Sequence, residues 1–305
     1  MDAAIDPRWR PWSYLLYAGA FVLLGAAGAL LSFLSSQHGP GVYALFSFLV
    51  FAAFAVAAAG LGSSGAHPIA AGLFAFVSVA LFTVFVVALW TWFGWLSASA
   101  NASLFAGFHP GRLSVLLIVL VAAAIAKRLS RFPLLQYVVV AAAYVFVTDL
   151  ISGGGDWSAV VTFLLGLVFL AWASVVDGGP NRSYGMWLHV AAGLAIGGSL
   201  LWFLHHGHFE WALIVVASLV YFWFAEVFDR ASWAVLGSIG ILAAATHYTT
   251  SWSHAHVSTS GASAGGSRAW VPAVVFGVAG ALLFLAGGAL ARRSAGRAGA
   301  GSVSG

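Results

Sequence analysis

The chain has 305 residues, of which 62% are hydrophobic and only 7% are charged, and its mean hydropathy is +1.00. A soluble domain of this size carries about a quarter charged residues to cover its surface, so the composition excludes a water-soluble protein and indicates one that lies in a lipid bilayer. The absence of cysteine excludes disulfides, iron–sulfur clusters and thiolate metal sites. The net charge is +4, and its twelve Lys and Arg residues are spread thinly along the chain. We interpret them as residues that orient the protein in the membrane, and not as a surface that binds nucleic acid.

Ten apolar runs follow one another along the chain, each near the roughly 20 residues that cross the hydrocarbon core. We expect spans at residues 13–35, 41–61, 69–96, 111–127, 133–151, 157–176, 185–204, 209–228, 232–250 and 270–291. Their apolar residues are continuous and do not alternate, so the predicted fold class is all-α, a polytopic transmembrane helical bundle.

This pattern predicts three regions: an N-terminal segment at 1–12, one transmembrane domain at 13–291 and a flexible tail at 292–305. The first run is longer than the roughly 7–15 apolar residues of a signal-peptide core, so we expect an uncleaved first span. All eight prolines fall in expected loops or in the first turn of a span, where a missing N–H costs no helical hydrogen bond.

The distribution of Lys and Arg predicts the orientation. With ten spans and the N-terminus inside, ten of the twelve basic residues lie on the inner side, whereas Arg112 and Arg268 lie outside. This excess follows the positive-inside rule. We therefore expect both termini in the cytoplasm and a multi-pass protein of the cytoplasmic (inner) membrane of a bacterium, in contact with the lipid bilayer and without a nucleic-acid partner.

Most of the ten histidines fall on the expected outer side, at the two ends of a hairpin made by spans 209–228 and 232–250. Imidazole-rich sites without thiolates suit Zn²⁺ or Cu²⁺, and Glu210 can add an oxygen ligand. The pattern also suits plain interfacial histidines, or a pH sensor that titrates near neutrality. The candidate metal ligands are His205, His206, His208, His254 and His256.

Buried polar residues are the other expected sign of function, because charges inside a membrane are costly. Asp149, with Thr148 beside it, is the best candidate for a buried carboxylate that contacts a substrate. His189 is expected one turn inside its span, more as a hydrogen-bonded packing residue than as a ligand. No acidic or basic residue falls at the centre of a span, which disfavours a proton relay through the bilayer.

Catalytic patterns are absent: the sequence has no His-Glu-x-x-His, Walker loop, Gly-x-Ser-x-Gly or carboxylate cluster. An enzyme is therefore disfavoured. Two function classes stay open. One is a binding, sensing or scaffold component, in which the outer histidines contact a metal ion, another membrane protein or a second copy of the chain. The alternative is a transporter or permease for a small solute or a lipid-like substrate.

Two segments carry a family resemblance. Asp177 to Gly193 contains Trp187-Leu188-His189 after a polar turn, and Glu226 to Gly240 contains Phe228-Asp229-Arg230. Over its last half the chain thereby resembles uncharacterised polytopic membrane proteins of bacteria, which implies an inner-membrane protein without a defined activity. By length and span count it is also similar to the ten-span drug/metabolite transporters, although no sequence motif or inverted five-plus-five repeat supports that likeness.

Overall fold

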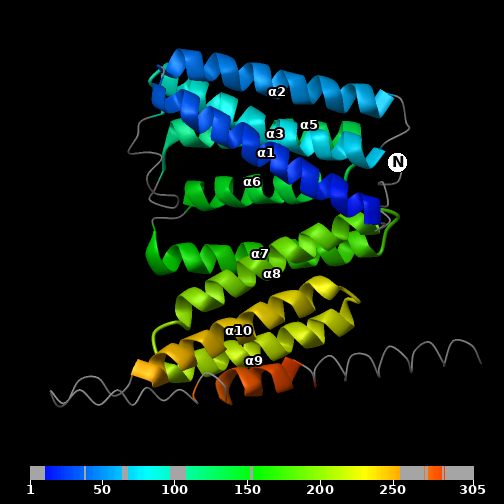
Figure 1. The fold of residues 1–305 in the computed structure, drawn as a ribbon. Helices are drawn as coiled ribbons and strands as arrows, with labels where there is room; N and C mark the ends of the chain where they lie inside the picture. Colours follow the sequence, from blue (N-terminus) through cyan, green and yellow to red (C-terminus); the bar gives the residue numbers. More distant parts are fainter. Residues whose placement is uncertain are drawn as a thin grey trace, which may run out of the picture. The chain divides into compact units, whose positions relative to one another are not determined.

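The computed structural model describes residues 11–37, 39–63, 68–96, 108–151, 154–254, 271, 274–283 and 285. Within these ranges the regular secondary structure is helical and there is no strand, which confirms the predicted all-α class (Figure 1). The helices are α1 (Pro11–Gln37), α2 (Pro40–Ser63), α3 (Pro68–Trp92), α5 (Pro110–Ser130), α6 (Leu134–Ile151), α7 (Gly155–Asp177), α8 (Arg182–Phe203), α9 (His208–Val227), α10 (Ala231–His254) and a last helix at Val274–Leu283.

Seven of the described helices are long and apolar enough to cross a membrane: α2, α3, α5, α6, α7, α8 and α9. They make the chain a multi-pass membrane protein by length and composition. Helix α10 is long enough but not one of the seven, because its last turns carry Thr246, His247, Thr249 and Thr250. The count of ten spans and the side on which each terminus lies stay predictions.

Proline marks where several of the helices begin. Helices α1, α2, α3 and α5 each start at a proline, and Pro133 directly precedes α6. The ring fixes a helical φ angle, and the missing N–H belongs to a position without an intrahelical acceptor. The expectation that prolines avoid the middle of the spans is confirmed for the prolines that the structure describes. Pro7 and Pro272 lie outside the described residues.

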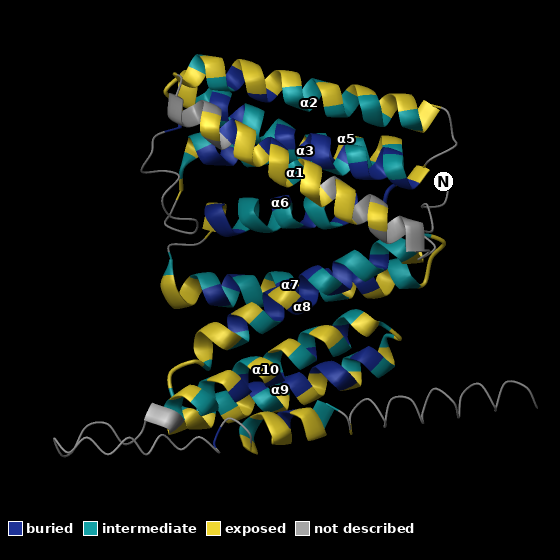
Figure 2. Ribbon diagram, viewed as in Figure 1, coloured by how far each residue is buried: buried dark blue, intermediate teal, exposed yellow. Residues whose placement is uncertain are grey.

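The chain divides into two compact units, Met1–Ala192 and Gly193–Gly305. Helix α8 begins in the first and ends in the second, so the predicted single domain at 13–291 stays a prediction. In the first unit α3 is the central helix and contacts α1, α2 and α5. Its buried side chains Leu73, Val77 and Leu81 form a core with Phe132 and Leu135, whereas α2 exposes much of its apolar surface (Figure 2).

The second unit is built on the antiparallel hairpin of α9 and α10, as predicted. Two glycines of α10 let the helices approach closely. A Cβ atom at Gly237 would lie 2.8 Å from the main-chain oxygen of Ser218, and one at Gly240 would collide with the Ser218 hydroxyl. Close backbone approach replaces the hydrophobic effect as the source of helix association in lipid, because lipid tails are as apolar as the side chains.

Trp233 lies in the first turn of α10 and is fully buried. The centroid of its indole lies 4.9 Å from the centroid of the Tyr221 ring and 5.1 Å from that of the Phe224 ring. The Tyr221 hydroxyl donates a hydrogen bond of 2.7 Å to the main-chain oxygen of Gly193 in α8. Leu236 packs where a side chain at Gly193 would lie. The last turns of α8 are thereby attached to the hairpin.

Substitution of Gly237 by alanine tests this close packing. We expect Gly237→Ala to lower the stability of the detergent-solubilised protein by about 1–3 kcal/mol, the usual cost of overpacking, because the main-chain oxygen that it meets cannot move aside. Thermal unfolding followed by circular dichroism measures the change. Gly198→Ala is the matched control: a Cβ atom there has no neighbour within 4 Å. Equal stability of the two variants would contradict the packing argument.

Candidate functional site

The α9–α10 hairpin brings two histidines together. Gly207, in an extended conformation, is the residue from which α9 starts, so His208 is the first residue of that helix. His247 lies near the end of α10, and antiparallel packing places the start of one helix beside the end of the other. The distance from His208 Nδ1 to His247 Nε2 is 3.4 Å. The ring centroids are 5.4 Å apart, so the nitrogens lie on the facing edges of the rings.

Aromatic and hydroxyl contacts hold this histidine pair. The His247 ring stacks on the indole of Trp211, with centroids 4.5 Å apart and planes at 9°. The Tyr248 hydroxyl donates a hydrogen bond of 2.5 Å to the main-chain oxygen of His208. The Ser251 hydroxyl donates to the main-chain oxygen of His247 at 2.7 Å. We call His208, Trp211, His247, Tyr248 and Ser251 the imidazole cluster.

The five predicted metal ligands are only partly placed in the structure. His205 and His206 are exposed, their rings lie 3.9 Å apart, and His205 Nδ1 is 2.6 Å from the main-chain oxygen of Trp202. His208 belongs to the imidazole cluster. The side chain of His254, and all of His256, lie outside the described residues. Within the described ranges no three His, Asp or Glu side chains are grouped to hold a metal ion, and the five-histidine site stays a prediction.

The predicted buried carboxylate has a partner that sequence reasoning missed. Asp149, 1% exposed, accepts two hydrogen bonds from Arg112, 8% exposed: one from Nη2 to Oδ1 and one of 2.7 Å from Nε to Oδ2. Thr148 donates its hydroxyl to the main-chain oxygen of Tyr144 in its own helix at 2.8 Å. Both side chains thus have partners within the protein, and their role as substrate contacts stays a prediction. The sequence held a sign of this pairing: Arg112 lies at the start of the expected span 111–127, and Asp149 lies near the end of the next expected span, 133–151.

His189 is buried and paired, in keeping with its interpretation as a hydrogen-bonded packing residue. Its Nε2 atom lies 2.8 Å from Oδ2 of Asp177, and its side chain is 0% exposed. This contact joins the end of α7 to the second turn of α8. The pair thus connects two helices across a short turn.

A second polar contact that the sequence did not predict joins three helices of the first unit. The Lys127 ammonium group donates a hydrogen bond to Oε1 of Gln136. It also lies 4.8 Å from the centre of the Tyr184 ring, a cation–π geometry. Gln136 is buried, and its Nε2 atom has no hydrogen-bond partner within the described part of the chain. The basic residue thus ties α5 to α6 and α8.

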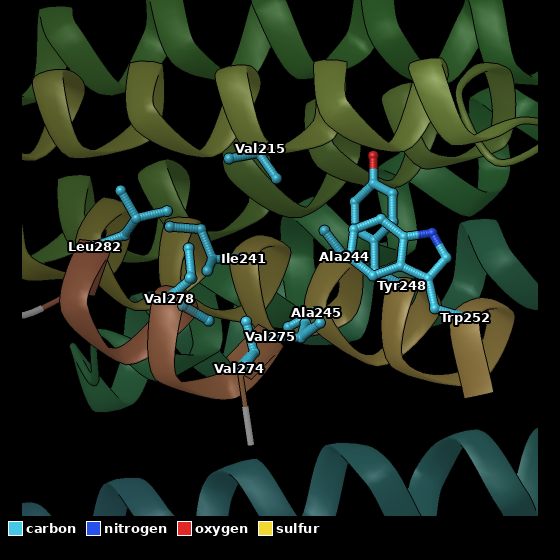
Figure 3. A pocket seen from close by; sticks show the side chains of 11 residues that line it. Val215, Ile241, Ala244, Ala245, Tyr248, Trp252, Val274, Val275, Val278 and Leu282 are labelled. Atoms are coloured by element: carbon cyan, nitrogen blue, oxygen red, sulfur yellow. The ribbon is translucent and has the colours of Figure 1, made fainter. Parts of the chain in front are cut away.

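An apolar groove of about 280 Å³ runs along the second unit. It is lined from α9, α10 and the last helix by Val215, Ile241, Ala244, Ala245, Tyr248, Trp252, Val274, Val275, Val278, Ala279 and Leu282. Figure 3 shows the rings of Tyr248 and Trp252 at one end and Leu282 at the other. Tyr248 therefore belongs both to the groove and to the imidazole cluster. The sequence did not reveal the groove, because its lining residues resemble any other lipid-facing residues.

No protein-family model, curated protein or solved structure matches this chain significantly. The resemblance to uncharacterised bacterial membrane proteins therefore stays a prediction.

A double-mutant cycle tests the buried ion pair. We expect Arg112→Met and Asp149→Leu each to lower the free energy of unfolding by about 3–5 kcal/mol, because each leaves one buried charge without its partner. The double variant should recover most of the loss, since it removes both charges. Thermal unfolding in detergent measures all three.

Arg128→Met is the matched control for the ion pair, because Arg128 is exposed on the same helix; it should change the stability little. Additive losses in the double variant would mean that Arg112 and Asp149 act independently and would contradict the pairing.

Proposed function

We propose that the protein is a non-enzymatic multi-pass membrane protein that binds an amphipathic, lipid-like molecule in the apolar groove of its second unit. The groove itself carries this proposal. Its volume of about 280 Å³ is just below the range for ligand pockets, about 300–1,000 Å³. The space suits a hydrocarbon chain better than a bulky ligand. Aliphatic side chains form most of its wall, and two aromatic residues stand at one end.

The physics of the bilayer explains why the ligand should be amphipathic. An apolar molecule that leaves lipid for a protein groove gains little from the hydrophobic effect, because both surroundings are apolar. Binding then depends on close packing and on polar contacts at one end. Tyr248 and Trp252 supply an aromatic end to the groove, and such rings favour the membrane interface. The histidine pair beside Tyr248 adds polar groups for a head group.

A polar solute is a weaker fit to the described residues. The buried charged and imidazole side chains there are Arg112, Asp149 and His189, and each has a partner within hydrogen-bond distance. A polar substrate that used one of these charged or imidazole groups would have to displace its present contact. Transport thus stays an alternative for a lipid-like substrate, because such a substrate needs no buried charged or imidazole side chain to bind.

The proposed membrane setting is the cytoplasmic membrane of a bacterium, with ten spans and both termini in the cytoplasm. The excess of Lys and Arg on one side supports this orientation. It puts the start of α9 and the end of α10 at the outer face, so the groove's aromatic end and the imidazole cluster would be reached from the outer leaflet.

Photo-crosslinking tests the proposal. The full-length protein in lipid nanodiscs is labelled with a phospholipid that carries a diazirine on one acyl chain. We expect labelled peptides to concentrate at α10 and the last helix. Ala244→Phe, which fills the groove, should lower this labelling about fivefold or more, because extra atoms in an occupied apolar site cost about 1–3 kcal/mol.

Ala171→Phe is the control for this experiment, because Ala171 is an exposed position of α7 and does not line the groove. Thermal unfolding of both variants verifies that they fold. Even labelling of all lipid-facing helices, unchanged by Ala244→Phe, would refute the binding proposal. Movement of the labelled lipid between leaflets of reconstituted vesicles, lost in Ala244→Phe, would assign the groove to transport instead of binding alone.

A further inference from the structure

We infer that His208 and His247 form a binding site for a tetrahedral transition-metal ion, and that Zn²⁺ fits it best. The two imidazoles come from different helices and face each other through single nitrogens, Nδ1 of His208 and Nε2 of His247. The inference goes beyond the proposed function and does not need a ligand in the groove, although the same histidine pair lies beside the groove's aromatic end. It also differs from the five-histidine prediction, because it names His247 as a ligand and does not need His254 or His256.

The separation of the nitrogens supports this assignment. Zinc–imidazole bonds are about 2.0–2.1 Å long, so two of them at a tetrahedral angle put their nitrogens about 3.3–3.4 Å apart. The observed distance is 3.4 Å. Square-planar geometry, which Cu²⁺ and Ni²⁺ prefer, would require about 2.9 Å. A tetrahedrally coordinated ion therefore fits the observed positions of the two rings. A square-planar ion would require the two nitrogens to move closer together.

The surroundings hold both ligands in place before any ion arrives. The indole of Trp211 lies almost parallel to the His247 ring and restricts its rotation. The hydrogen bond from Tyr248 to the main-chain oxygen of His208 fixes the start of α9 against α10. Preorganised ligands lose less conformational entropy on binding, so two histidines on two packed helices can bind more tightly than histidines on a long loop.

The remaining coordination positions would be open. The Ser251 hydroxyl lies 3.4 Å from Nε2 of His247, near enough to hydrogen-bond a water molecule on the ion. Two imidazoles and water make an exchangeable site, weaker than the closed four-ligand sites that stabilise folds. Hard cations such as Mg²⁺ prefer oxygen ligands, so the pair should discriminate against them. Without metal, one ring can donate its N–H to the other. When the ion binds, the donor ring would take its other tautomer, in which the proton lies on the nitrogen that faces away from the ion.

Calorimetric titration tests the site. The full-length protein is purified in detergent, treated with a chelator and titrated with ZnCl₂ or MgCl₂. We expect one zinc ion per chain and no binding of Mg²⁺. His208→Ala and His247→Phe should each weaken zinc binding about tenfold or more, since even the loss of an outer-shell partner costs 10–100-fold. The phenylalanine keeps a ring against Trp211 and removes only the nitrogens.

Two control variants isolate the pair. His206→Ala removes an exposed imidazole close by in the sequence. His254→Ala combined with His256→Ala removes the two later candidates of the five-histidine prediction. Both control variants should bind zinc as the unaltered chain does. Circular dichroism and gel filtration verify that each variant is folded. Unchanged zinc affinity in His208→Ala and His247→Phe would overturn the inference, and so would a loss of binding confined to the control variants.

Discussion

A polar group inside a bilayer must find its partner within the protein, because lipid offers none. The structure meets this requirement at two levels. The backbone satisfies its own hydrogen bonds in long helices, and the buried charged and imidazole side chains of the described residues occur in pairs: Arg112 with Asp149, and His189 with Asp177. Each pair joins two helices near their ends, so the same contacts that give these polar groups a partner also fix which helices are neighbours.

Between their ends, the helices are held together by close packing. Gly237 and Gly240 allow α10 to lie against Ser218 of α9, and Gly193 leaves room for Leu236. In water, burial of apolar surface would drive such contacts; in lipid the gain comes from close packing of atoms. Where packing is less close, as between α9, α10 and the last helix, an apolar groove remains. The groove and the tight hairpin thus have a common physical origin.

Tyr248 connects the two candidate sites. One side of the ring lines the groove, while its hydroxyl is bonded to the main-chain oxygen of His208. An occupant of the groove and an ion on the histidine pair would therefore both contact the end of α10. In the proposed function, this arrangement would let the second unit recognise a molecule with an apolar part and a polar part without a charge at the centre of the bilayer.

The sequence by itself determined the helical class, the approximate helix boundaries and the hairpin of α9 and α10, since apolar run length and proline position depend only on local chain properties. It also singled out Asp149, His189 and His208. The partners Arg112 and Asp177 were decided by tertiary structure, as were the facing ring edges of His208 and His247 and the groove. A side-chain partner depends on the rotation of each helix about its axis, and in a helix that is apolar on all sides, residue type does not reveal which face meets a neighbour.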